Sequence, residues 1–166
     1  MLRSRKNLST TVAVENGPTG DLVRIVGPMS DEVRAPLFSL LSRKLGKKCI
    51  VNFREVAWID SSGTRAWLLF IKEFAEGREV LLEECTPDIM MTIGMVPSFI
   101  GGCQVVSAYG RYYCEPCRVS LSVLFDTAKM EGGQLVPPQI CPTCSQAMLF
   151  DYEPEDYFSV VLPRAG

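Results

Sequence analysis

The chain has 166 residues, of which 47% are hydrophobic, and its formal net charge is −2. This length allows one domain or two small ones, and the charge gives no reason to expect a nucleic acid or a membrane surface as partner. The absence of histidine from the sequence excludes nucleophile activation by a Ser–His or Cys–His pair.

Residues 1–10 are predicted to be a flexible lead-in without a function of their own. They are basic but lack the apolar run of a signal peptide, and no stretch of the chain approaches the length of a membrane span. We therefore expect a cytoplasmic protein that is not bound to a membrane. In that compartment, seven cysteines indicate metal binding rather than disulfides.

Residues 11–109 are predicted to form an α/β domain with a mixed β-sheet and packed helices. Hydrophobic periodicity and turn residues separate the elements. In chain order we expect a β-hairpin at 12–27, a helix capped by Ser30 that ends near Gly46, a strand that starts at Cys49 and breaks at Asp60, a helix after Ser61, a strand at 79–84, a helix capped by Thr86 at 86–95, and a last strand at 100–109.

The central strand breaks at Asp60-Ser61-Ser62-Gly63 and continues as a helix. The hydrophobic period changes there from that of a strand to that of a helix, which places Ser61 at a helix N-terminus. Such a position offers unpaired N–H groups and the positive end of the helix dipole, which favour a phosphate. A plainer interpretation is that Ser61 or Ser62 is only an N-cap, since serine is strongly preferred there.

The stretch Val56-Ala57-Trp58-Ile59-Asp60-Ser61-Ser62-Gly63 resembles the signature of the STAS domain family, which includes anti-sigma-factor antagonists and sulfate-transporter tails. The expected element order, and the similarity of residues 27–31 to the family's Gly-x-x-Asp opening of the first helix, extend this resemblance over residues 11–109. The resemblance implies that Ser61 is a phosphoacceptor, with Ser62 as the alternative. It also implies a protein partner, such as an anti-sigma factor or serine kinase.

The partner-binding surface implied by the resemblance comprises Asp60, Ser61, Ser62, Gly63 and Arg65. The chain departs from the antagonists directly after the motif, because Thr64-Arg65 stands where they usually have Leu-Gly. An arginine adds bulk and charge beside the serine. It could also pair with a phosphate on Ser61, because guanidinium and phosphate form bidentate hydrogen bonds.

Residues 110–166 contain two Cys-x-x-Cys pairs, Cys114/Cys117 and Cys141/Cys144, separated by 23 residues. Two residues between thiolates let one tight turn present both sulfurs to a tetrahedral ion, so two such turns close a four-cysteine zinc site. One strand is expected at 119–125, and the unit resembles a zinc ribbon, although Ser145 replaces a glycine that often follows the second knuckle. Redox dithiols or chance cysteines are the alternative interpretation.

A closed four-thiolate shell leaves no position for water, so one structural zinc and no catalysis are predicted. Residues 111–166 contain four basic and seven acidic residues, which disfavours nucleic acid. The other cysteines, Cys49, Cys85 and Cys103, are expected to be small buried hydrophobes. The acidic and aromatic tail at 148–161 is expected to dock on this chain or on a partner.

Two functions follow from these observations, and neither is an enzyme. The first is a regulatory protein-binding module, similar to an anti-sigma-factor antagonist, that is switched by phosphorylation of Ser61. The second is a constitutive scaffold or adaptor in which the zinc ribbon is the interaction surface and Ser61 is only a helix cap.

Overall fold

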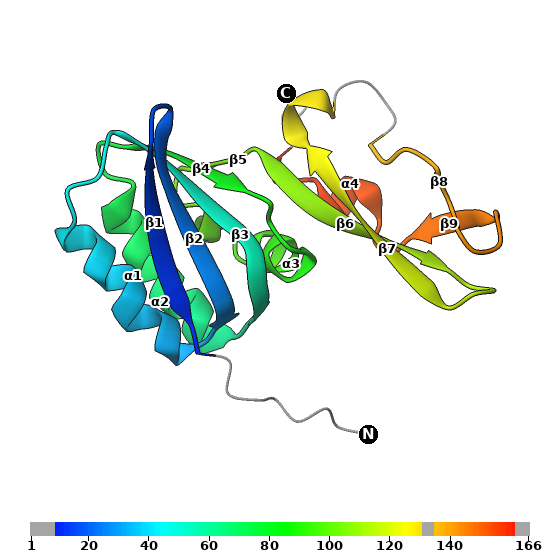
Figure 1. Cartoon of the computed structure of the whole chain (residues 1–166), viewed down its shortest axis with the longest axis horizontal. Coiled ribbons are helices and arrows are strands. Elements are labelled where there is room, and N and C mark those ends of the chain that lie inside the picture. The colour runs from blue at the N-terminus through cyan, green and yellow to red at the C-terminus, as the bar shows by residue number, and fades with distance from the viewer. Residues whose placement is uncertain (1–8, 131–134, 162–166) are drawn as a thin grey trace.

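The structure, a computed structural model, describes residues 9–130 and 135–161. Within these ranges the chain forms two β-sheets that lie side by side, with four α-helices (Figure 1). The expected α/β class is therefore confirmed. Most of the predicted lead-in lies outside the described residues, but Thr10 is buried and its hydroxyl donates to the Pro28 carbonyl.

The first sheet has five strands in the order β1-β2-β3-β4-β5. Strands β1 and β2 form the expected antiparallel hairpin, and β2, β3, β4 and β5 run parallel to one another. Side chains of β2 alternate between the core and the surface, which is the pattern of a half-covered sheet. The strands are β1 (Thr11–Gly17), β2 (Gly20–Met29), β3 (Lys48–Ile59), β4 (Glu79–Glu83) and β5 (Gln104–Val105).

Helix α2 (Ser61–Phe74) buries an aromatic stripe in the core of this sheet. Trp67 lies edge-on against Phe53 of β3, and its indole N–H donates to the Phe99 carbonyl. Phe70 packs against Phe38 of helix α1 (Arg34–Ser39). Burial of such large rings at helical spacing holds α2 on the sheet.

The helix expected between Ser30 and Gly46 is broken into three short pieces. A 3-10 turn at Asp31–Val33 precedes α1, and another at Leu40–Ser42 follows it. Pro36 explains the late start of α1, because proline has no N–H to donate to the carbonyl four residues before it. Ser30 makes no side-chain capping bond.

The strand expected at 100–109 is also wrong in its extent. Residues Pro97–Ile100 form a 3-10 turn, and Gly101 and Gly102 follow with positive φ. Two successive residues in that region reverse the chain, so β5 begins only at Gln104. After Val106 the chain leaves the first sheet and enters the second.

The second sheet is antiparallel and has the strand order β7-β6-β9-β8. Its core is a cluster of aromatic rings, including Tyr112, Phe125, Phe150 and Phe158. The elements are β6 (Ser107–Cys114), β7 (Val119–Asp126), β8 (Gln139–Ile140), β9 (Ala147–Phe150) and helix α4 (Pro154–Tyr157).

The acidic and aromatic tail therefore packs on this chain: the Tyr157 hydroxyl donates to the Tyr109 carbonyl, and Phe158 is fully buried. The boundary predicted near Gly110 falls inside β6. Strand β6 is also tied to the first sheet, because the Cys85 N–H donates to the Ser107 carbonyl. That residues 11–109 fold without the rest stays a prediction.

Candidate functional site

The four cysteines of the two Cys-x-x-Cys pairs lie together at the ends of two hairpins. Cys114 ends β6, and the turn that contains Cys117 leads into β7; Cys141 follows β8, and the turn that contains Cys144 leads towards β9. Both turns use the same backbone pattern. The Arg118 N–H donates to the Cys114 carbonyl, and the Ser145 N–H donates to the Cys141 carbonyl.

Arg118 and Ser145 have positive φ values of 55° and 59°. This is the left-handed region, which glycine adopts without strain. The geometry explains why a glycine often occupies the position of Ser145 in knuckles of this kind. The same conformation at Arg118 was not predicted, because arginine gives no local signal for it.

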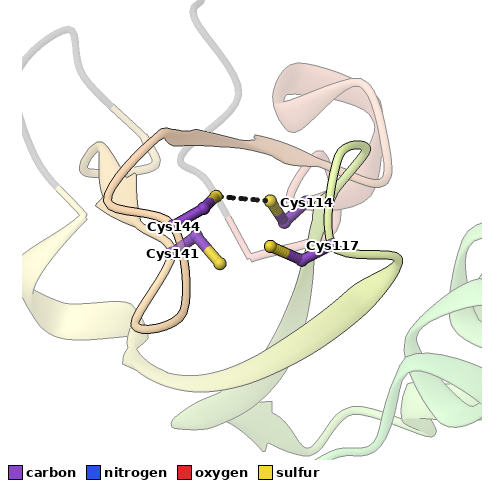
Figure 2. Close-up of side chains that lie close together, drawn as sticks. All are labelled: Cys114, Cys117, Cys141 and Cys144. Atoms are coloured by element: carbon purple, nitrogen blue, oxygen red, sulfur yellow. Dashed lines mark hydrogen bonds between the residues drawn. The ribbon is translucent and has the colours of Figure 1, made fainter.

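The four sulfur atoms all lie within 4.8 Å of one another. Figure 2 shows the side chains pointing toward a common centre, and the dashed line joins Cys114 Sγ to Cys144 Sγ, which are 3.5 Å apart. A tetrahedral ion with metal–sulfur bonds of about 2.3 Å places its ligands about 3.8 Å apart. The cluster therefore has the dimensions of a four-thiolate metal site rather than of disulfides.

The electrostatics of the cluster also favour a cation. The backbone N–H groups of Cys144 and Thr143 hold the pKa of the Cys141 thiol down at about 6. Two causes raise the pKa of the Cys117 thiol to about 12: the larger is hydrogen bonding with the Cys144 thiol, and the smaller is burial. Four thiolates cannot be charged together without a compensating ion, and a bound divalent cation removes that conflict. The remaining cysteines, Cys49, Cys85 and Cys103, lie outside this cluster: the first two are buried and the third is half-buried.

The second candidate site is the N-terminus of α2. Asp60, not a serine, is the N-cap: its carboxylate accepts from the Gly63 N–H at 2.9 Å and from the Ser62 hydroxyl at 2.6 Å. The interpretation of Ser61 or Ser62 as the cap is therefore wrong. Ser61 is the first residue of the helix and is exposed. No hydrogen bond of its hydroxyl is seen within the described ranges.

Gly63 is needed because α2 begins against the end of β2. A Cβ atom on Gly63 would lie 1.8 Å from the Met29 carbonyl oxygen. The same oxygen accepts a hydrogen bond from the Asp60 N–H at 3.1 Å. The glycine therefore fixes where the helix starts and, with it, where Ser61 is presented.

A groove of about 390 Å³ lies beside Ser61. It brings together three of the predicted site residues, Asp60, Ser61 and Arg65, whereas Ser62 and Gly63 do not line it. The other side chains come from the end of β3, from α2, and from helix α3 (Pro87–Met95) with the residue after it. They are Ile59, Thr64, Leu68, Thr92, Met95 and Val96.

The contribution of α3 to this groove was not predicted. Met95 is 72% exposed, whereas Met90, on the same helix, is buried. The signal in the sequence was a cluster of methionines at 90, 91 and 95, but periodicity alone does not tell which of them face the core.

Comparison with known proteins assigns no family. A scan against models of protein families finds no match, and no curated protein matches the chain. Within the described parts of the chain, no helix combines the length and apolar character needed to cross a membrane.

Proposed function

We propose that this protein is a regulatory, non-enzymatic module that binds a protein partner over the N-terminus of α2, and that phosphorylation of Ser61 weakens this binding. The observation that carries the proposal is the state of Ser61. It is exposed at the start of a 14-residue helix, its hydroxyl is not used as a cap, and it lies at an apolar groove. The resemblance of residues 11–109 to STAS domains, in the motif and in the order of helices and strands along the chain, supports the same function.

The fold should tolerate a phosphate at this position. Phosphorylation adds a charge of about −1.5 to −2, which the positive end of a helix dipole stabilises. Arg65, exposed in the next turn of α2 and in the same groove, supplies a guanidinium that can pair with it. The repulsion from Asp60 works in the opposite direction, so the net effect on stability is expected to be small.

The partner would respond much more strongly than the fold. A protein surface docked over the groove must remove water from the phosphate, and burial of an unpaired charge costs several kcal/mol, so affinity should fall by roughly two orders of magnitude or more. Anti-sigma factors or serine kinases of the kind that bind STAS antagonists are the proposed partners. We place the interaction in the cytoplasm, where reduced thiols persist.

We further propose that the cysteine cluster holds one zinc ion, through Cys114, Cys117, Cys141 and Cys144. Four thiolates in a tetrahedral arrangement are typical of structural zinc, and they leave no coordination position for a substrate or a water. The ion would cross-link the β6–β7 hairpin to the β8–β9 hairpin. Its role is therefore to stabilise the second sheet.

A constitutive scaffold is the second candidate function. Two residues of the ribbon favour it, because Ile140 and Leu149 are each 58% exposed and could contact a partner directly. This alternative treated Ser61 as the N-cap of α2, but the N-cap is Asp60.

Phosphosite mapping and quantitative co-purification from the native cells test the two functions. Tagged Ser61→Ala should retain a partner that Ser61→Asp loses, and Ser62→Ala is the matched control that should leave phosphorylation intact. Arg65→Ala distinguishes two roles of the arginine. If Arg65 contacts the kinase, the variant should be phosphorylated less, whereas if it only pairs with the phosphate, phosphorylation should be unchanged. If Ser61 is unmodified, and its alanine and aspartate variants recover the same partners in equal amounts, the scaffold is the correct function.

A further inference from the structure

Strand β7 forms an open edge of the second sheet. It pairs with β6 along its full length, from Val119 opposite Cys114 to Asp126 opposite Ser107. On its other side it has no neighbouring strand, and no backbone hydrogen bond reaches it from any segment that the structure describes. Such an edge presents a row of N–H and C=O groups to which another strand can pair.

Apart from Asp126 at its last position, this edge lacks the features that normally prevent pairing. Residues 119–125 contain no charge, no proline and no glycine, and Val119, Ser120, Ser122 and Leu124 are exposed. The long edge strand of the first sheet, β1, differs in carrying Glu15, which pairs with Arg24. The remaining edges, β5 and β8, are two residues long each. Among the described strands, β7 is thus the edge best suited to take another strand.

The sequence of this edge is complementary to itself. Val119-Ser120-Leu121-Ser122-Val123 reads the same in both directions. In an antiparallel pair with a two-fold axis at Leu121, each valine at 119 lies opposite a valine at 123, and each serine at 120 lies opposite a serine at 122. Such a pairing is isologous, as expected for a two-fold dimer.

The two faces of the sheet match in the same register. Val119, Leu121 and Val123 share one face with Tyr112, which is directly opposite Leu121 in β6, because alternate residues of a strand point the same way. Ser120 and Ser122 lie on the other face. The pairing therefore joins apolar side chains to apolar ones and hydroxyls to hydroxyls, which are the cross-strand pairs that stabilise sheets.

We propose that the protein forms a homodimer in which β7 pairs antiparallel with β7 of a second copy, centred on Leu121, so that the two four-stranded sheets become one continuous sheet. A contact made chiefly by one short strand from each copy is smaller than a standard protein interface, so the dimer is expected to depend on concentration. The proposal does not rest on phosphorylation of Ser61.

The test uses the full chain with its metal bound, and measures mass by sedimentation equilibrium over a wide range of concentration. The wild type should rise from the 18.4 kDa of one chain toward twice that value. The double variant Ser120→Lys/Ser122→Lys should stay at the mass of one chain, because the substituted side chains face each other across the axis. Both serines are exposed, so folding should be unaffected, and circular dichroism checks this.

A charge-reversed variant makes the test specific for this register. Ser120→Asp/Ser122→Asp should also be monomeric alone, whereas an equimolar mixture with the lysine variant should form a heterodimer. The matched control is Thr11→Lys/Ala13→Lys, on exposed positions of the edge strand β1, which should dimerise like the wild type. The proposal is overturned if the wild type stays monomeric, if the folded lysine variant dimerises, if the control does not, or if the mixture forms no heterodimer.

Discussion

The substitution Gly63→Ala should destabilise the protein, although alanine is the better helix former. The added Cβ would lie 1.8 Å from the Met29 carbonyl oxygen and 2.3 Å from its carbon. Both contacts involve backbone atoms, so no side chain can turn aside, and the start of α2 must move away from β2 by roughly 1 Å or more to reach an ordinary contact distance.

The expected change in the free energy of unfolding follows from three contributions. Overpacking against a rigid neighbour costs about 1–3 kcal/mol. Weakening of the hydrogen bond from the Asp60 N–H to the Met29 carbonyl costs about 0.5–1.5 kcal/mol. Replacing glycine in a helix returns about 1 kcal/mol. We expect a net destabilisation of about 2 kcal/mol.

Urea unfolding followed by circular dichroism measures this change, and Gly94→Ala is the matched control. Gly94 lies within α3, and apart from its chain neighbours and the helix's own backbone no atom lies within 4 Å of the Cβ position there, so alanine should stabilise the protein by about 0.5–1 kcal/mol. Equal stability of the two variants would refute the close approach of α2 to β2, and with it our explanation of how Ser61 is positioned.

Two further predictions concern the metal and acid stability. Cys141→Ser should reduce bound zinc from one per chain to nearly none, measured by elemental analysis, because three thiolates no longer close the shell. Tryptophan fluorescence should change little, since the two tryptophans, Trp58 in β3 and Trp67 in α2, both belong to the first sheet and its helix. Asp21 accepts hydrogen bonds from the Gly46 N–H and from Asn16, which lower its pKa. The contribution of Asp21 to stability is therefore complete above the pKa of about 3.9 that an aspartate has in the unfolded chain. It is lost as the pH falls through the lower pKa that Asp21 has in the folded protein. In acid denaturation, Asp21→Asn should remove that part of the pH dependence, and an unchanged slope would contradict it.

Strongly local signals in the sequence predicted the two candidate sites. The change of hydrophobic period at residue 60 located the start of α2, and the paired cysteine spacings located the four cysteines that cluster at metal-binding distance. The start of α2 and each Cys-x-x-Cys turn depend on residues that are close in the chain, where steric rules act directly.

Features decided by competition between neighbours or by distant contacts were missed. Three adjacent residues, Asp60, Ser61 and Ser62, are all good N-caps, and the carboxylate of Asp60 forms the cap; a charged acceptor makes the stronger hydrogen bond. Thr86 was expected to cap α3 with its side chain, but it makes no such bond, and its buried hydroxyl has no partner within the described structure. The passage of β6 from one sheet to the other depends on pairing with strands far along the chain, which periodicity does not report.

The two sites should act independently, and this separates the two proposed functions. The residues that line the groove beside Ser61 come from β3, α2, α3 and the residue after α3, whereas the four clustered cysteines lie on the turns of the β6–β7 and β8–β9 hairpins. Perturbations of distant sites without shared contacts usually add to within about 0.5 kcal/mol.

If the partner docks over Ser61, Cys141→Ser and Ser61→Asp should therefore have additive effects on binding free energy, with the larger effect from Ser61→Asp. Isothermal titration calorimetry with the identified partner, at a temperature where each variant is folded, measures the change in binding free energy caused by each substitution. A scaffold that binds through the ribbon would show the reverse order, because loss of the metal would remove the binding surface while the charge at position 61 would leave it intact.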